Sequence, residues 1–280
     1  MTARTLSWDA CLNARDMGGL PVTGGETSFG CVARMETVRQ LTGDGWQAVR
    51  AFGVTTIVDL REPAEIEADE PLDASPLLEE RTSFGGEGQH DGGADGPALR
   101  RATRTVNVPL LEWSPGLGEH FDRINLAQPD EVASTRAVYL EMLRIGRARF
   151  TEAVVSVADA PDGAVLVHCH AGKDRTGLVV ALLLLVAGAS AETVADDYAL
   201  SGSNLEPLMQ PWLDEAVDER ARELRRRVAS APAAAMIDVI DELDRVHGGA
   251  AGFLLGAGAT EDDLARIRTR LVNSKGLLRA

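Results

Sequence analysis

The sequence predicts an α/β fold in which a short central parallel sheet is flanked by helices. Two runs rich in β-branched and apolar residues, at 54–60 and 164–168, are continuous rather than alternating, which is typical of parallel strands covered on both faces. A helical pattern precedes each run, and an apolar stretch at 178–189 follows the second. Strands and helices therefore alternate along the chain, as in α/β domains.

Composition and charge describe an ordinary globular protein. Hydrophobic residues make up 45% and charged residues 25% of the 280 residues, so a sizeable core can form. The formal net charge of −15 disfavours nucleic acid and anionic lipid as partners. Any anion would therefore have to be bound by a local cluster of donors.

The cysteine count and the first residues predict a cytoplasmic protein with no stable membrane anchor. Cys11, Cys31 and Cys169 are too few for a disulfide framework, which indicates a reducing compartment. Residues 1–10 lack the basic start and apolar stretch of a signal peptide, although export without one stays open. The stretch 178–189 is shorter than the roughly 20 residues that span a bilayer, so we interpret it as a core helix.

The first strand of the predicted sheet follows a short helix. Leu41, Trp46 and Val49 recur at helical spacing, and Gly53 ends the pattern. The strand at 54–60 begins directly afterwards, which gives the helix-then-strand order of an α/β unit.

A polar segment separates this strand from the next. Residues 85–97 are mostly glycine and polar residues, so we expect a mobile surface loop rather than a domain boundary, and we treat 1–280 as a single domain. A second strand is expected over 105–108. It ends at Pro109, which has no amide to continue a central ladder.

Two helices are expected before the next strand. Apolar residues recur at helical spacing over 132–143 and 150–157, and a turn with Pro and Gly follows at 160–163. The strand 164–168 comes next, and a polar loop joins it to the helix over 178–189.

The remaining residues predict helices outside the sheet. Charged residues with intermittent apolar positions over 204–247 indicate amphipathic helices, which could form a lid over a site or simply pack on the surface. Thr260 can cap a last helix, in which Leu264 and Ile267 share a face.

The polar loop carries the chemistry that the sequence predicts. Residues 168–177 read His-Cys-His-Ala-Gly-Lys-Asp-Arg-Thr-Gly, so five residues separate Cys169 from Arg175. A loop of this length at a helix N-terminus can turn its amides inward and bind a phosphate with the help of the helix dipole. That field, with Lys173 and Arg175, favours a thiolate at Cys169.

These residues predict a phosphoryl transfer that needs no metal or cofactor. The thiolate of Cys169 would attack phosphorus, while Arg175 binds two phosphate oxygens through its planar fork. The hydroxyl of Thr176 is placed to stabilise the departing thiolate. The remaining phosphate contacts would come from the intervening loop residues, His170, Ala171, Gly172 and Lys173.

The segment resembles the Cys-x5-Arg signature of protein tyrosine and dual-specificity phosphatases. Its longer pattern resembles the atypical bacterial tyrosine phosphatase family that includes mycobacterial protein tyrosine phosphatase B. Residues 13–19 (Asn-Ala-Arg-Asp-Met-Gly-Gly), 58–61 (Val-Asp-Leu-Arg) and 252–255 (Gly-Phe-Leu-Leu) also resemble segments of that family. The resemblance implies one phosphatase-fold domain without a metal.

The resemblance also implies substrates and further roles. Members of that family act on phosphotyrosine, phosphoserine or phosphothreonine, and phosphoinositides, so phosphotyrosine proteins or phosphoinositides are the expected substrates and inorganic phosphate the product. It assigns acid/base work to Asp174, and Lys173 resembles a loop cation of phosphoinositide phosphatases. Glu112 lies where relatives carry an aspartate and is a second candidate acid. Arg15 and Asp16 would either orient the site or close the N-terminal turn.

The sequence leaves other interpretations of the loop open. His168 could be a hydrogen-bonding scaffold or a proton shuttle. A phosphoinositide phosphatase, an inactive phospho-binding module and a sulfurtransferase are the alternative functions. A pure binder has no obvious use for both Cys169 and Arg175, and sulfur transfer would not require Arg175. A nucleotide-binding phosphate loop is excluded, because Asp174 follows Lys173 where that motif has Ser or Thr.

Overall fold

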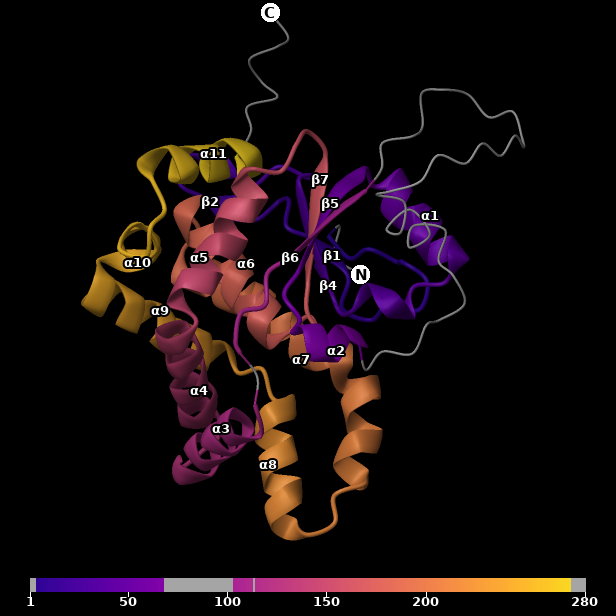
Figure 1. Ribbon diagram of the computed structural model, residues 1–280, viewed down its shortest axis with the longest axis vertical. Coiled ribbons are helices and arrows are strands. Elements are labelled where there is room, and N and C mark those ends of the chain that lie inside the picture. The colour runs from indigo at the N-terminus through magenta and orange to yellow at the C-terminus, as the bar shows by residue number, and fades with distance from the viewer. Residues whose placement is uncertain (1–3, 68–102, 113, 273–280) are drawn as a thin grey trace, which may run out of the picture.

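A five-stranded sheet forms the centre of the molecule (Figure 1). The computed structural model describes residues 4–67, 103–112 and 114–272. In spatial order the strands are β1 (Arg15–Asp16), β4 (Val32–Met35), β7 (Ala164–His168), β5 (Val54–Asp59) and β6 (Arg104–Asn107). The last four are mutually parallel, and β1 joins the edge antiparallel to β4. The predicted α/β fold class is confirmed, with one short antiparallel strand added.

Helices cover both faces of the sheet, as the continuous apolar strands predicted. In β7, Val165 and Val167 pack into the core formed with α5 (Arg147–Ala158) and α6 (Asp174–Val186). The alternate residue Leu166 packs with Trp46 of α1 (Gly43–Ala51) on the opposite face. Figure 1 shows α5 and α6 on one side of the sheet and α1 on the other.

The remaining elements surround this core. A separate hairpin pairs β2 (Pro21–Val22) with β3 (Gly25–Glu26), and a 3-10 turn, η1, spans Val38–Gln40. The other helices are α2 (Pro63–Glu67), α3 (Pro115–Ala127), α4 (Glu131–Ile145), α7 (Ala191–Asp214), α8 (Glu219–Ala229), α9 (Ala233–His247), α10 (Gly249–Leu255) and α11 (Glu261–Leu271). Thr260 caps α11 as predicted, in a capping box closed by Asp263.

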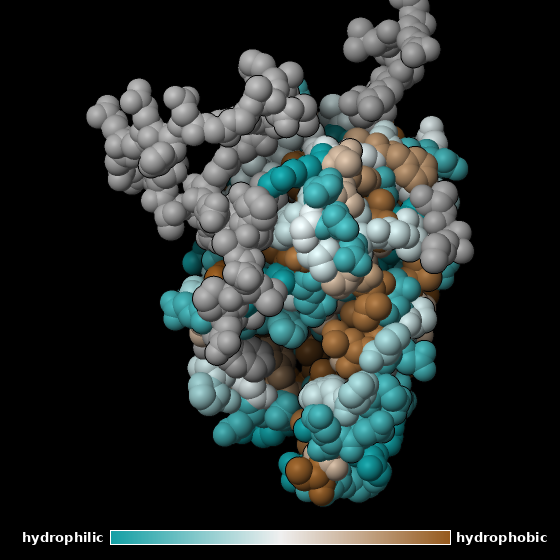
Figure 2. Space-filling model, turned by 90° about the vertical axis from the view of Figure 1, so that its right-hand side faces the viewer, coloured by the Kyte–Doolittle hydropathy of each residue, from teal (hydrophilic) through white to brown (hydrophobic). Residues whose placement is uncertain are grey.

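Helices α7 and α8 form an arm that projects away from the sheet (Figure 1). None of the residues of α8 is buried. Figure 2 shows a mostly hydrophilic arm with a hydrophobic spot at its tip and a hydrophobic hollow where the arm meets the body. Val217, between α7 and α8, is 88% exposed. The prediction of helices outside the sheet over 204–247 is confirmed.

Two further expectations concern loops and membranes. The predicted mobile loop at 85–97 lies outside the described residues. Among the helices within 4–67, 103–112 and 114–272, none combines the length and the apolar character that a membrane crossing needs.

Candidate functional site

Three parallel strands end together and place the candidate site at one edge of the sheet. His168 at the end of β7 is in register with Met35 at the end of β4 and with Asp59 at the end of β5. The chain leaves β7 as residues 169–173, which we call the cysteine loop, and enters α6 at Asp174. Crevices beyond the carboxyl ends of parallel strands are where α/β proteins bind ligands.

The cysteine loop is curled rather than extended. Gly172 adopts a left-handed conformation with φ of 65°, and a Cβ there would lie 2.2 Å from the carbonyl oxygen of Met35. Only glycine fits such a position. No side chain caps the N-terminus of α6, and within the described chain the amides of 170–173 donate no backbone hydrogen bond. These amides and the helix N-terminus are free to bind an anion.

Two side chains hold the carbonyl groups of the loop from the strand side. Asn13 donates its amide to the carbonyl oxygens of Ala171 and Gly172, at 3.3 and 3.2 Å. Arg34, on β4, donates Nη2 to the Gly172 carbonyl at 2.6 Å. Fixing these carbonyls on the side of the sheet leaves the amides on the other side. Sequence analysis missed Arg34, although an arginine within an otherwise apolar buried strand is a signal that could have identified it.

A buried carboxylate on α7 organises the arginines beneath the loop. Asp197 accepts hydrogen bonds from Arg4 Nη1 at 2.8 Å, Arg15 Nε at 3.0 Å and Arg34 Nη1 at 2.9 Å. Burial alone would raise the pKa of Asp197, but the charges of Arg15 and Arg34 hold it well below its ordinary value. The network therefore connects α7 to the loop through Arg34.

The two candidate auxiliary residues of the N-terminal segment are separated by the structure. Arg15 joins the Asp197 network and also donates to Ser201 Oγ at 3.0 Å. The carboxylate of Asp16 instead accepts the amides of Gly18 and Gly30, both at 2.8 Å, and closes the turns at those residues.

Arg175 is bound by a glutamate that sequence analysis did not select. Its Nη1 and Nη2 atoms donate to Glu65 of α2, at 2.5 and 2.7 Å. Burial would lower the pKa of Arg175, but the hydrogen bonds and the charge of Glu65 raise it above its ordinary value. In the sequence, only the closeness of Glu65 to the Asp-Leu-Arg segment at 59–61 could have identified it as a residue of the site.

Lys173 at the end of the cysteine loop and Asp174 at the start of α6 interact with other helices. Asp174 Oδ1 accepts a hydrogen bond from the hydroxyl of Tyr139 on α4 at 2.6 Å. Lys173 Nζ lies 3.2 Å from the same oxygen and donates to the carbonyls of Val228 and Ser230, at 2.5 and 2.8 Å. The predicted loop cation therefore binds the C-terminal end of α8.

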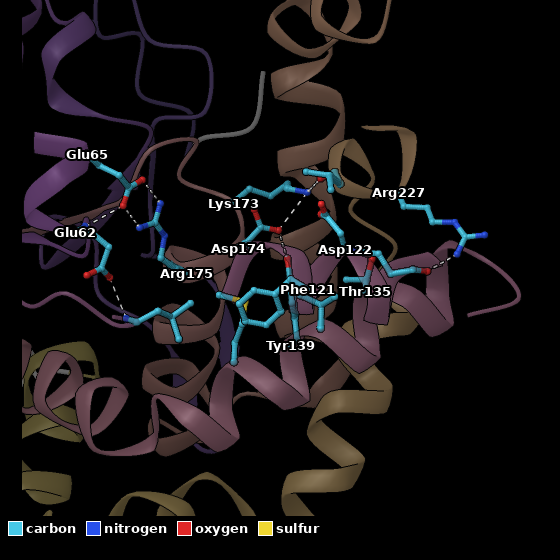
Figure 3. A pocket seen from close by; sticks show the side chains of 16 residues that line it. Glu62, Glu65, Phe121, Asp122, Thr135, Tyr139, Lys173, Asp174, Arg175 and Arg227 are labelled. Atoms are coloured by element: carbon cyan, nitrogen blue, oxygen red, sulfur yellow. Dashed lines mark hydrogen bonds and ion pairs between the residues drawn. The ribbon is translucent and has the colours of Figure 1, made fainter. Parts of the chain in front are cut away.

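A pocket of about 480 Å³ opens beside these residues (Figure 3). Lys173, Asp174 and Arg175 lie on its polar side. Its apolar lining comes from α3, α4, α8 and the segment after β6, as Leu111, Phe121, Val138, Met142 and Val228. The pocket can therefore bind a ligand with one anionic end and an apolar body.

Other predicted residues lie at the border of the pocket or below it. Cys169 and Thr176 are buried, His170 is exposed, and none of the three is part of the pocket lining. Glu112 is also exposed and outside the lining. Glu62 is one of the carboxyl groups that line the pocket; it accepts the Leu111 amide at 3.0 Å, and burial raises its pKa.

His168 has the surroundings of a scaffold residue. Its ring is fully buried, with Nδ1 3.1 Å from the Cys169 carbonyl oxygen and Nε2 3.8 Å from Asp59 Oδ2. Burial lowers the pKa of His168, so the ring is neutral at physiological pH.

Comparison with known proteins agrees with this geometry. A family model described as "Tyrosine phosphatase family" matches residues 6–273. A tyrosine-protein phosphatase of Nostoc commune is 33% identical over 48% of this chain and 47% of its own length. A triple specificity protein phosphatase of Mycobacterium tuberculosis is 30% identical over 45% of this chain and 49% of its own. The chain thus spans about half the length of these relatives. From the family match over almost its whole length, the chain belongs to the tyrosine phosphatase family.

Proposed function

We propose that the protein is a cysteine-dependent phosphatase of the protein-tyrosine-phosphatase type, which hydrolyses phosphomonoesters through a cysteinyl-phosphate. The observation that carries the proposal is the curled loop between β7 and α6, which places Cys169 directly before a helix N-terminus without a side-chain cap and Arg175 in the first turn of that helix. Such an arrangement binds a phosphate and activates a thiolate at once.

In the first step the sulfur of Cys169 attacks phosphorus, and the bond from phosphorus to the ester oxygen breaks. The electron pair of that bond goes to the leaving oxygen, which takes a proton from the carboxyl of Asp174. Arg175 and the loop amides bind the phosphate oxygens, on which negative charge is carried throughout the transfer. The Nε edge of Arg175 is left for this purpose, because Glu65 binds the other edge.

In the second step water attacks the phosphorus of the cysteinyl-phosphate. Asp174 takes the proton of the water, the bond from sulfur to phosphorus breaks, and inorganic phosphate leaves. The buried hydroxyl of Thr176, which has no hydrogen-bond partner among the described residues, supports its proposed role as donor to the departing thiolate.

We propose phosphotyrosine proteins as the leading substrates. The apolar pocket beside Asp174 and Arg175 suits the ring of an aryl phosphate. Dual specificity is supported by the mycobacterial relative, which is named a triple specificity protein phosphatase. Phosphoinositides are the alternative, for which Lys173 would supply a further cation after leaving its carbonyl partners on the arm.

We propose one phosphatase domain over 1–280, with the α7–α8 arm as a lid. Strands β5 and β7 contribute to the apolar clusters on both sides of the sheet, which supports a single unit. Val228 of the arm lines the pocket, which supports the lid. A cytoplasmic location stays a prediction of the cysteine content.

The test is hydrolysis of p-nitrophenyl phosphate with a chelator present. We expect turnover by the wild type, loss of turnover in Cys169→Ser, and retention in the matched control Cys11→Ser, because Cys11 lies outside the loop. Turnover that survives in Cys169→Ser would overturn the proposal. Phosphotyrosine peptides and soluble phosphoinositides in the same assay then decide the substrate class.

A further inference from the structure

Tyr139 is a pocket residue that the proposed chemistry leaves without a role. It lies on α4, far from the cysteine loop in sequence, and only 2% of it is exposed. Its hydroxyl donates to Asp174 Oδ1 at 2.6 Å (Figure 3). A hydrogen bond of this length to a carboxylate is of the strong, charge-assisted kind.

A second tyrosine hydrogen-bonds to Tyr139, and the direction of that second bond follows from the first. The hydroxyls of Tyr139 and Tyr198, on α7, are 2.8 Å apart, and the two rings meet edge to face. A hydroxyl has one proton, so when Tyr139 donates to an ionised Asp174, Tyr198 must donate to Tyr139. Burial, followed by the charge of Asp174, raises the pKa of Tyr139 well above its ordinary value. Tyr139 therefore stays protonated and remains a donor.

The two oxygens of Asp174 consequently differ. Oδ1 is held by Tyr139 and lies 3.2 Å from Lys173 Nζ, whereas no partner of Oδ2 occurs in the described part of the chain. The side chain is 38% exposed and lines the pocket. An acid/base carboxyl needs one oxygen for the proton and a fixed orientation for its transfer. Oδ1 can accept from Tyr139 both before and after Oδ2 gains a proton.

We infer that Tyr139 is a positioning residue that holds Asp174 so that Oδ2 faces the leaving group. The inference rests on the proposed function, in which Asp174 protonates the leaving oxygen. It predicts that removing the Tyr139 hydroxyl damages proton transfer while leaving phosphate binding intact. The alternative is that the hydroxyl is merely a buried polar group satisfied by the nearest carboxylate.

Substrates whose leaving groups differ in basicity distinguish a positioning role of Tyr139 from a merely structural one. An alkyl or phenolic oxygen needs a proton to leave, whereas p-nitrophenolate is a weaker base and needs it less. For Tyr139→Phe we expect kcat/KM with a phosphotyrosine peptide, which reports the first step, to fall about 10-fold, a part of the 10²–10⁴-fold that a positioned acid contributes. We expect kcat/KM with p-nitrophenyl phosphate to fall less than about 3-fold, and the inhibition constant of inorganic phosphate to stay within about 2-fold.

Two further variants make the test specific. In an Asp174→Asn background, Tyr139→Phe should cause no further loss, because groups that act as a unit are not additive. Tyr198→Phe removes a buried hydroxyl from the same cluster but keeps the Tyr139–Asp174 bond. Its loss of activity should therefore be smaller than that of Tyr139→Phe and equal for both substrates. Thermal unfolding of all variants, and of the Tyr139→Phe/Tyr198→Phe double variant, reports loss of fold.

The outcomes separate the inference from the proposed function. Equal losses of kcat/KM on both substrates in Tyr139→Phe, or a full additional loss in the Asp174→Asn background, would show a structural role and overturn the inference. If Asp174→Asn lowers activity equally on both substrates, Asp174 does not protonate the leaving group, and the inference fails together with that role. The role of Cys169 is decided separately, by the Cys169→Ser assay.

Discussion

Glu65 binds both terminal nitrogens of Arg175, with its two carboxylate oxygens 2.5 and 2.7 Å from Nη1 and Nη2. The pair is bidentate, and only 17% of the Arg175 side chain is exposed. A guanidinium bound along this edge keeps Nε and the adjacent hydrogen of Nη2 for a second anion. Glu65 therefore fixes the plane in which Arg175 can meet a phosphate.

Replacing Glu65 by glutamine should weaken both the fold and phosphate binding. The variant removes the negative partner of a largely buried cation, so we expect a loss of about 1–2 kcal/mol in the free energy of unfolding. We also expect KM for p-nitrophenyl phosphate to rise about 10-fold, because Arg175 is no longer held in one orientation. Denaturant unfolding and steady-state kinetics measure these effects.

Inorganic phosphate provides the decisive comparison for this variant. A bound phosphate supplies the negative charge that Glu65→Gln removes, so saturating phosphate should recover part of the lost stability. The exposed Glu67 on the same helix is the matched control, and Glu67→Gln should change neither quantity. If Glu65→Gln loses the same unfolding free energy with and without phosphate and its KM is unchanged, Glu65 does not orient Arg175 for phosphate.

Gly172→Ala should disrupt the cysteine loop. The new Cβ would meet the Met35 carbonyl oxygen at 2.2 Å in a residue whose φ is 65°. Gly30 has a similar φ of 73° but nothing within 4 Å of a Cβ, so Gly30→Ala measures the conformational strain alone. We expect about 1 kcal/mol of destabilisation for Gly30→Ala, and for Gly172→Ala a larger loss with at least about 10-fold lower kcat/KM. Similar values in the two variants would argue against the clash.

Asp197→Asn should be strongly destabilising. It leaves the buried guanidinium groups of Arg15 and Arg34 without their carboxylate, and breaking a buried ion pair typically costs about 3–5 kcal/mol. The neighbouring Asp196 is exposed, and Asp196→Asn is expected to be neutral. Urea unfolding of both variants tests this. A loss below about 1 kcal/mol for Asp197→Asn would mean that solvent reaches the cluster.

The same carboxylate should make stability dependent on pH on the acid side. The pKa of Asp197 is lower in the folded protein than in the unfolded chain, where it is about 3.9. Its contribution is therefore fully present above pH 3.9 and is lost as the pH falls through the lower folded value. The difference in unfolding free energy between wild type and Asp197→Asn should shrink as the pH is lowered from 5 toward 2. A constant difference would contradict this.

Lys173→Met should loosen the arm. Lys173 donates to two carbonyls at the end of α8, and no residue of α8 is buried. These bonds therefore hold the helix together with those of Arg227 to the carbonyls of Asn125 and Gln128. We expect faster amide hydrogen exchange over 219–229, with exchange in α9 unchanged. Among the described residues, the ion-pair partners of Arg226 are Glu219 and Glu223 of the same helix. Arg226→Gln is therefore the control and should leave exchange at the junction with Lys173 unaltered. Unchanged exchange in Lys173→Met would show that Lys173 does not hold the arm.

The sequence alone determined several of the elements and the reactive loop. Continuous apolar runs mark β5, β7 and α6, and helical spacing marks α1, α4 and α5, because the local pattern of apolar residues reports which faces are buried. The loop from Cys169 to Arg175 was recognisable because its chemistry lies within one short segment. The prediction over 85–97 remains outside the described residues.

Only the tertiary structure decided what surrounds that loop. Glu65, Arg34 and Tyr139 come from three separate elements and contact residues 172–175 across 110, 138 and 35 positions of the sequence. Asp197, on a fourth element, acts on the loop through Arg34, which lies 163 positions away. Side-chain pairing across such separations follows from how helices dock on the sheet, which no local pattern encodes. For the same physical reason, position along the chain selected Glu112, which lies outside the pocket lining, and did not select Glu62 and Glu65, which are part of it.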